Sequence, residues 1–163
     1  MLIDFSELFK KQLELDLEIQ KRHNVTYDET LERRFLSLFV EIGELANATR
    51  CFKYWSNKGS EPRERVMDEY ADGLHFLLSI GIALNIKNKA FNQKETNEDL
   101  SHLFVKMYEQ ISELENKKDE DTYQKTFELF LLIAFKLDMN KDDIFSSYFL
   151  KLGENYHRQE TNY

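Results

Sequence analysis

Apolar residues recur along the chain at three- and four-residue intervals, which is the spacing typical of amphipathic helices. Short polar stretches with turn-forming residues separate these segments, for example "SNKGSEP" at 56–62 and "KNKAFNQKETNED" at 87–99, and both are expected to be loops. Five or six helices are therefore predicted, over residues 4–23, 27–55 (continuous or broken), 62–86, 99–116, 122–137 and from "MNKDD" to about 159.

Turn-forming residues are scarce, which narrows the fold class. The chain has 163 residues with only five glycines and one proline, whereas a β-sandwich or β-barrel needs many turns. Hydrophobic residues make up 42% of the sequence, enough for a substantial core. We expect one all-α domain spanning residues 1–163, built as a helical bundle.

The net negative charge of the chain limits the kinds of molecule that it is expected to bind. A formal net charge of −8 without a basic run argues against nucleic-acid binding, and an anionic ligand would need a divalent metal to offset the field. The most apolar stretch, Leu74 to Leu84, is too short to span a bilayer, and the N-terminus does not resemble a signal peptide. The single Cys51, expected to be a small buried side chain, excludes an internal disulfide and fits a cytoplasmic location.

Two acidic pairs lie beside apolar helix faces. In the second predicted helix, one apolar stripe consists of Phe35, Leu38, Phe39, Ile42, Leu45, Ala46 and Phe52. Glu41 flanks this stripe directly, and Glu44 lies one step further round. In the third, Glu69 and Asp72 share a face at the mouth of a segment that is apolar almost all round.

Four carboxylates near core faces would repel one another and lose solvation, unless a cation lies between them. Mg²⁺ matches an all-carboxylate ligand set and commonly binds substrate phosphates as well. The residues therefore indicate a Mg²⁺ site for a polyphosphate, although a single such pair is more often a solvated helix face. A di-iron site using Asp72 and His75 is a weaker alternative because the second acid–histidine pair is missing. His75 is otherwise expected to be a hydrogen-bonded core residue.

Several of these segments resemble a known family. "EIGELANATRCFKYWSNKG" and "DEYADGLHFLLSIGI" are similar to the dimeric all-α dUTPases of Gram-positive bacteria and their phages. These enzymes belong to the all-α NTP pyrophosphohydrolase superfamily, with the MazG-like enzymes as relatives. The superfamily pattern ExxE…ExxD is present as Glu41-x-x-Glu44 and Glu69-x-x-Asp72. The elements "LFKKQLELDLEI" and "YFLKLGENYHRQE" extend the resemblance to nearly the whole chain.

The resemblance implies a homodimer that hydrolyses dUTP to dUMP and pyrophosphate, with dUDP left open as a second substrate. Glu41, Glu44, Glu69 and Asp72 would hold two or more Mg²⁺ ions, for which Mn²⁺ could substitute. The metals would bridge phosphate oxygens and acidify a water, and Glu41 is the candidate general base.

Further candidate residues lie outside the acidic pairs. Gln12 and Asp16 fall inside the apolar stripe of the first helix, where buried polar groups need partners. The resemblance implies that Gln12 helps to form the base pocket, with Asp16 as a further candidate for base contact and internal hydrogen bonds as the alternative. The resemblance makes Trp55 a candidate for the base pocket and Lys58 a candidate for a phosphate, with core packing and a solvated loop position as the respective alternatives. Phe76 follows the acidic pair on the same helix face, so it is a candidate for packing on the deoxyribose, with plain core packing as the alternative.

The last predicted helix presents Tyr148, Lys151, Asn155 and Arg158 on one face. Such a face is usually only solvated. The resemblance makes Lys151 and Arg158 phosphate-binding candidates, and Asn155 a polar nucleotide contact.

Two other functions remain open on the sequence alone. One is MazG-like pyrophosphohydrolysis of a different nucleotide, because motif spacing does not define the base pocket. The other is a helical dimer that serves as an interaction module. Since phage-borne dUTPases of this type can bind repressor proteins, a repressor is also a candidate partner.

Overall fold

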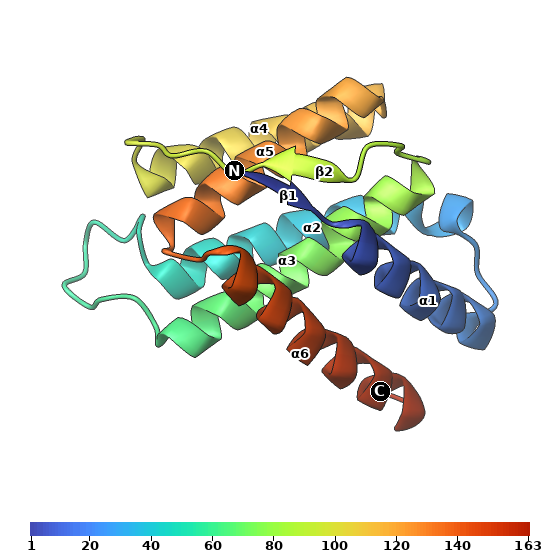
Figure 1. The fold of residues 1–163 in the computed structure, drawn as a ribbon. Coiled ribbons are helices and arrows are strands. Elements are labelled where there is room, and N and C mark those ends of the chain that lie inside the picture. The colour runs from blue at the N-terminus through green and yellow to red at the C-terminus, as the bar shows by residue number, and fades with distance from the viewer.

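The computed structural model describes all residues from 1 to 163. Six helices and two short strands follow one another along the chain (Figure 1), with these bounds: β1 Leu2–Asp4, α1 Ser6–His23, α2 Tyr27–Thr49, α3 Arg63–Ala83, β2 Ala90–Asn92, α4 Leu100–Lys117, α5 Glu120–Lys136 and α6 Lys141–Glu160. The all-α class and the number of helices predicted from the sequence are confirmed.

Polar caps explain why most of the helices begin where they do. The Thr26 side chain accepts a hydrogen bond from the Glu29 amide at the start of α2, and Asn140 and Asp143 form a reciprocal capping box on α6. Asp99 and Asp119 cap α4 and α5 in the same way. Each cap satisfies a backbone donor that has no partner within the helix.

The second helix is shorter than predicted. It ends at Thr49, because Arg50 adopts a left-handed conformation with φ of 58°, and its N–H closes the helix onto Ala46 and Asn47. Residues 50–62 then form an irregular connection rather than six further helical residues. The assignment of Phe52 to the apolar stripe is therefore wrong, and its side chain is 42% exposed. Cys51 lies in the same connection and is only partly buried.

The expectation that residues 87–99 form only a loop is also wrong. Residues 90–92 form β2, which pairs antiparallel with β1 and places Ile3 opposite Phe91. The predicted first helix starts at Ser6 rather than Asp4, because residues 2–4 belong to β1. Phe91 of β2 and Phe5, which directly follows β1, both pack on Phe127 of α5, so this small sheet and the start of α1 close one side of the core.

Helix α3 lies at the centre of the molecule, as its nearly uniform apolar sequence predicts. It packs against α1, α2, α5 and α6 (Figure 1). Tyr70 of α3 stacks on Phe130 at 4.1 Å and donates its hydroxyl to the Phe130 carbonyl oxygen. A single contiguous apolar cluster includes side chains from every helix. Beyond its exposed first turn, which carries Arg63, Glu64 and Arg65, polar groups on α3 such as Glu69, His75 and Ser79 are buried against other helices.

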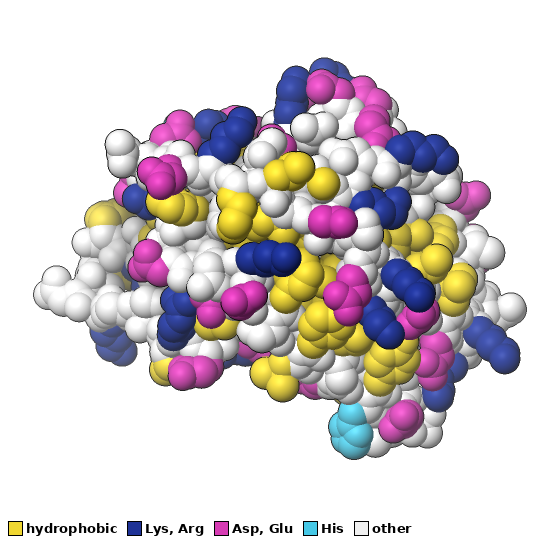
Figure 2. All heavy atoms as spheres, viewed as in Figure 1, with side chains coloured by type: hydrophobic (Ala, Val, Ile, Leu, Met, Phe, Trp, Pro, Cys, Tyr) yellow, Lys and Arg dark blue, Asp and Glu magenta, His cyan; other side chains and the backbone are white.

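Charges of both signs are interspersed over the face shown in Figure 2, with apolar side chains between them. None of the helices combines the length and the apolar character needed to cross a membrane.

Candidate active site

The facing sides of α2 and α3 carry polar residues in two layers. On α2, Arg34 and Glu41 are seven residues apart, and on α3, Ser79 and Asp72 are also seven apart. Seven residues make almost two complete turns, so each pair lies on one helix face about 10 Å apart. The two helices therefore present an acidic layer at one level and an Arg–Ser layer at another.

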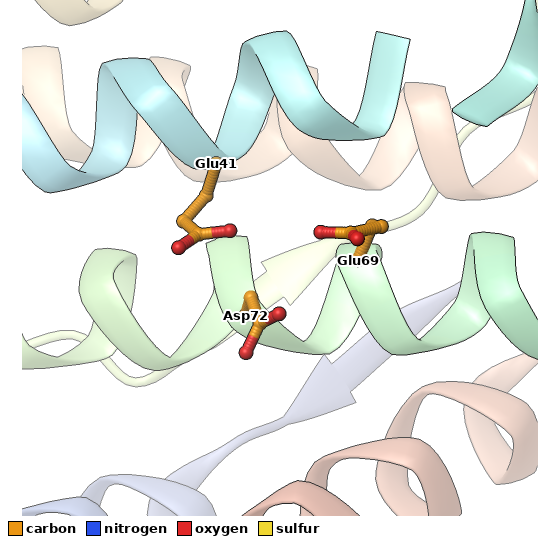
Figure 3. A group of neighbouring side chains, drawn as sticks. All are labelled: Glu41, Glu69 and Asp72. Carbon is orange, nitrogen blue, oxygen red and sulfur yellow. The ribbon is translucent and has the colours of Figure 1, made fainter. Parts of the chain in front are cut away.

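The acidic layer brings three carboxylates together. Oxygen atoms of Glu41, Glu69 and Asp72 lie within 4.8 Å of one another, and Figure 3 shows Glu41 reaching from α2 toward the other two on α3. Glu69 is buried, while Glu41 and Asp72 are partly exposed. Glu41 Oε2 and Glu69 Oε2 are both shielded from solvent without a hydrogen-bond partner. Buried acceptors of this kind need a cation or a donor.

The environment raises the pKa of each of these carboxyl groups. Burial, followed by the charges of Asp72, Glu44 and Glu69, raises the pKa of Glu41 from 4.5 to about 8. Burial also raises the pKa of Glu69 to about 7, although the Arg65 guanidinium opposes the shift. The pKa of Asp72 is raised by burial and held down in part by the Lys151 ammonium. Without a bound cation, burial and mutual repulsion therefore disfavour the charged form of these carboxylates.

Glu44 lies at the edge of this cluster rather than inside it. Its side chain is exposed, yet its charge contributes to the raised pKa of both Glu41 and Glu69. It lines a second hollow of about 420 Å³ together with Glu61, Arg65 and Glu69. Of the four carboxylates that the sequence predicts as metal ligands, three therefore lie together and the fourth, Glu44, lies beside them.

These residues fit a divalent, oxygen-preferring ion. The donor set is entirely carboxylate, and two of its oxygens have no partner within the protein. Mg²⁺ binds such ligands and keeps coordination positions for water and phosphate. The di-iron alternative has no support in this geometry, because the cluster contains no histidine.

Two cations flank the acidic cluster. Arg65 contacts Glu69 and lies 3.2 Å from Asp68, and sequence reasoning did not identify it. Lys151 of α6 is 2% exposed, and its Nζ lies 3.2 Å from Asp72 Oδ1. Burial alone would lower the Lys151 pKa, but hydrogen bonds to Asp68 and Asp72 outweigh it and raise that pKa. Lys151, predicted to bind phosphate, is therefore an ion-pair partner of a cluster carboxylate in this structure.

A pocket of about 380 Å³ opens from the acidic cluster along α2 and α3 toward α1 and α6. Among the residues predicted from the sequence, its lining includes Gln12, Asp16, Glu41, Asp72, Phe76, Asn155 and Arg158. These positions come from four helices, and the fold brings them into one cavity. The volume is in the range of pockets that hold small ligands.

The family model for dUTPase matches residues 4–163 of the chain. The chain belongs to this dUTPase family. The reaction of the family is the hydrolysis of dUTP to dUMP and pyrophosphate. A comparison with curated proteins gives no match. In this chain the acidic cluster, which could hold a metal ion, lies next to the pocket of about 380 Å³.

The end of this pocket away from the acidic cluster is a buried hydrogen-bond network centred on Asp16. Its carboxylate accepts hydrogen bonds from Gln12 Nε2 at 2.9 Å, Tyr27 Oη at 2.9 Å and Ser79 Oγ at 2.8 Å. Arg34 Nη1 lies 3.6 Å from the same carboxylate and also donates to Ser79. Sequence reasoning singled out Gln12 and Asp16 but missed Arg34, Ser79 and Tyr27. The seven-residue spacing from Arg34 to Glu41, and from Asp72 to Ser79, could have indicated two of them.

His75 lies in the wall of the same pocket. Its ring stacks on Tyr148 at 4.2 Å, and its Nε2 is 3.4 Å from the Tyr148 carbonyl oxygen, while Nδ1 has no partner. Burial lowers the pKa of His75 to about 3, so the ring is neutral near pH 7. The sequence predicts a buried, hydrogen-bonded core histidine. His75 is buried and one of its ring nitrogens has a hydrogen-bond partner, but the other nitrogen, Nδ1, has none.

Two of the predicted site residues do not line the pocket. Trp55 and Lys58 both lie in the connection between α2 and α3, where Trp55 is 65% exposed and contacts Phe52 and Tyr54 edge-on. Lys58 is exposed as well. Within a single chain, neither residue reaches the pocket lining, so the structure gives no support for their assignment to base and phosphate contacts.

Proposed function

We propose that this chain is a Mg²⁺-dependent dUTPase whose acidic cluster binds the ions that hold the triphosphate. The observation that carries the proposal is the close approach of Glu41, Glu69 and Asp72 beside a pocket of about 380 Å³, with two carboxylate oxygens unpaired. Glu44 completes the ligand set, and Mn²⁺ is expected to substitute for Mg²⁺. Bound ions would neutralise the triphosphate and polarise the phosphorus that water attacks.

Glu41 is the best candidate for the general base. Glu69 is paired with Arg65, and Asp72 is paired with Lys151, whereas no cation contacts Glu41. Glu41 also lines the pocket directly. An unpaired carboxylate that faces the substrate can accept a proton from an attacking water more readily than one held by a salt bridge.

The two layers of the pocket give the nucleotide an orientation. The phosphates belong next to Glu41 and Asp72, and the base belongs about 10 Å away along the helices, near Gln12 and Ser79. Phe76 lies on α3 between these levels and lines the pocket, where it can pack on the deoxyribose. Arg158 and Asn155 of α6 also line the pocket and are proposed to contact phosphate and nucleotide polar groups.

Lys151 is proposed to move from Asp72 toward the phosphates when the ions bind. Its present partners are carboxylates, and a cation added to the cluster would reduce their attraction for the ammonium group. Trp55 and Lys58 stay predictions for base and phosphate contact.

We also propose that the chain forms a homodimer. Exposed apolar side chains on α2 and α4 support this proposal: Leu36 is 61% exposed, Val40 49% and Val105 58%. Tyr108 of α4 stacks on Phe39 of α2, so the two helices form a joined surface. Buried on a second copy, such side chains would contribute favourable apolar area.

A nucleotide panel tests the proposed reaction. Pyrophosphate release is measured with Mg²⁺ for dUTP, dCTP, dTTP and UTP, each with and without EDTA. Strong preference for dUTP with full dependence on the metal is expected. Equal turnover of dUTP, dCTP and dTTP would favour the MazG-like alternative, and no metal-dependent turnover would refute an enzymatic function.

A Glu41 variant tests the assignment of the base. Glu41→Gln keeps the size of the side chain but cannot accept the proton, so kcat is expected to fall by about a thousandfold or more. Circular dichroism should show an unchanged helix content. Full activity of this variant would contradict the role given to Glu41.

A further inference from the structure

The amide of Gln12 is held at both ends. Its Nε2 donates to Asp16 Oδ1 at 2.9 Å, and its Oε1 accepts a hydrogen bond from Tyr148 Oη at 3.0 Å. The side chain is 3% exposed and lines the pocket. A buried amide with a partner on each atom has one preferred orientation.

The Asp16 carboxylate decides which orientation that is. Tyr27, Ser79 and Arg34 surround it with two O–H groups and a guanidinium, all of which need an acceptor. With these donors around it, the carboxylate serves as a hydrogen-bond acceptor, so the neighbouring amide must turn its N–H₂ group toward it. The opposite orientation would place the Gln12 carbonyl oxygen against Asp16, with two acceptors facing each other.

The Tyr148 hydroxyl reinforces the same orientation from the other side. It has one proton, which points to Gln12 Oε1 or to the Leu8 carbonyl oxygen at 3.3 Å. The ring cannot move easily, because His75 stacks on it at 4.2 Å and its side chain is fully buried. Sequence reasoning placed Tyr148 on a face with charged residues and gave it no role.

Gln12 keeps one N–H and one oxygen lone pair for a ligand after these two bonds. A donor next to an acceptor matches the edge of uracil, which presents a carbonyl oxygen beside the N3–H group. Cytosine presents the reverse, an amino group beside an unprotonated N3. A rotated amide would match cytosine, so the orientation of this one group separates the two bases.

We propose that Asp16 and Tyr148 are positioning residues that lock the Gln12 amide in the orientation that selects uracil over cytosine. The inference rests on the proposed function, because it takes Gln12 as the group that reads the base. It gives Asp16 a role different from base contact, since its oxygens are already occupied by Gln12, Tyr27 and Ser79. Selectivity against the wrong base arises because a buried group would otherwise be left unpaired.

The test compares kcat and KM for dUTP and dCTP in the wild type, Tyr148→Phe and Asp16→Asn. Tyr148→Phe removes one hydrogen bond and is expected to lower the dUTP-to-dCTP ratio of kcat/KM by about tenfold. Asp16→Asn provides an amide that can donate to Gln12 Oε1, and a loss of about a hundredfold is expected. Both changes should appear mainly in KM, because neither residue touches the acidic cluster.

Tyr123→Phe is the matched control. It removes a fully buried hydroxyl that donates to the Leu77 carbonyl oxygen; neither residue lines the pocket, so the ratio should stay unchanged. A ratio unchanged in Tyr148→Phe and Asp16→Asn, with a wild type that prefers dUTP, would overturn the inference and leave the proposed function standing. A wild type without preference for dUTP would overturn the proposed function itself.

A second readout does not depend on turnover. The side-chain amide of Gln12 should give two well-resolved NMR signals in the wild type, and they should broaden or shift in Tyr148→Phe as the amide rotates. If the Gln12 signals are the same in both proteins, the lock does not exist.

Discussion

The metal-free protein should become more stable when Glu41 is changed to Gln. This variant removes one charge from a cluster in which the Glu41 pKa is raised from 4.5 to about 8. Gln has nearly the same shape as Glu and stays neutral at every pH. The unpaired Glu41 Oε2 would be replaced by a group without charge, and the repulsion by Asp72 and Glu69 would disappear.

The size of the effect follows from the pKa of Glu41. A rise from 4.5 to about 8 corresponds to at most about 5 kcal/mol at pH 8. Because Glu41 is only partly buried, solvent screening reduces this to about 1–2 kcal/mol. For a chain of this length, that gain raises Tm by about 3–6 °C.

The pH dependence has a definite sign. Glu41 has a higher pKa in the folded than in the unfolded state, so the folded state holds the proton and loses stability as pH rises between 4.5 and about 8. The advantage of Glu41→Gln should therefore be small at pH 5 and fully developed above pH 8. Addition of Mg²⁺ should reverse the order, because the wild type keeps a ligand that the variant lacks.

Differential scanning fluorimetry gives the Tm of the wild type and the variant at pH 5 and pH 8, each in EDTA and in Mg²⁺. Glu109→Gln is the control, since Glu109 is an exposed carboxylate on α4 without an ion pair. The reasoning is refuted if Glu41→Gln lowers Tm at pH 8 in EDTA, or if its effect is the same at both pH values.

Two further predictions concern the acidic cluster, and a third concerns the exposed apolar face of α2. Lys151→Met should lower the free energy of unfolding by about 2–3 kcal/mol in urea titrations, because it leaves Asp72 without its ammonium partner and Asp68 with Arg65 alone; an unchanged midpoint would contradict this. Mg²⁺ binding at pH 7 should release protons, because Glu41, with a pKa of about 8, and Glu69, with a pKa of about 7, are partly protonated before the ion binds. Calorimetry in two buffers of different ionisation enthalpy should then give different binding heats, and identical heats would show that no protons are released. Leu36→Glu should shift a dimer to monomer in light scattering, and a dimer that persists would exclude this face of α2.

Sequence reasoning predicted the helices because their apolar spacing is a local property. The predictions of the fold that are wrong depend either on contacts between residues far apart in the sequence or on the backbone angle of a single residue. The pairing of Ile3 with Phe91 joins residues far apart in the chain, and three residues per strand give no readable alternation. The end of α2 depends on the left-handed conformation of Arg50, which is not a residue type that marks such a position.

In the candidate site, too, contacts within one helix were predictable from the sequence, whereas contacts between helices were not. Spacing within one helix was sufficient to place Glu69 beside Asp72, and two such pairs indicated a shared cation site. The partners supplied by other helices were not predictable from spacing. Lys151 reaches Asp72 from α6, and Tyr148 reaches Gln12 across 136 residues of sequence. These contacts depend on how the helices pack, which periodicity does not specify.

The contact between Lys151 and Asp72 has a consequence for how the chain is made. All four carboxylates have left the ribosome long before Lys151, which is synthesised 79 residues after Asp72. During that interval the crowded acids on α2 and α3 have no ammonium group from α6 to attract them. The charge balance at Asp72 is therefore completed only when α6, the last helix to be made, docks against α3.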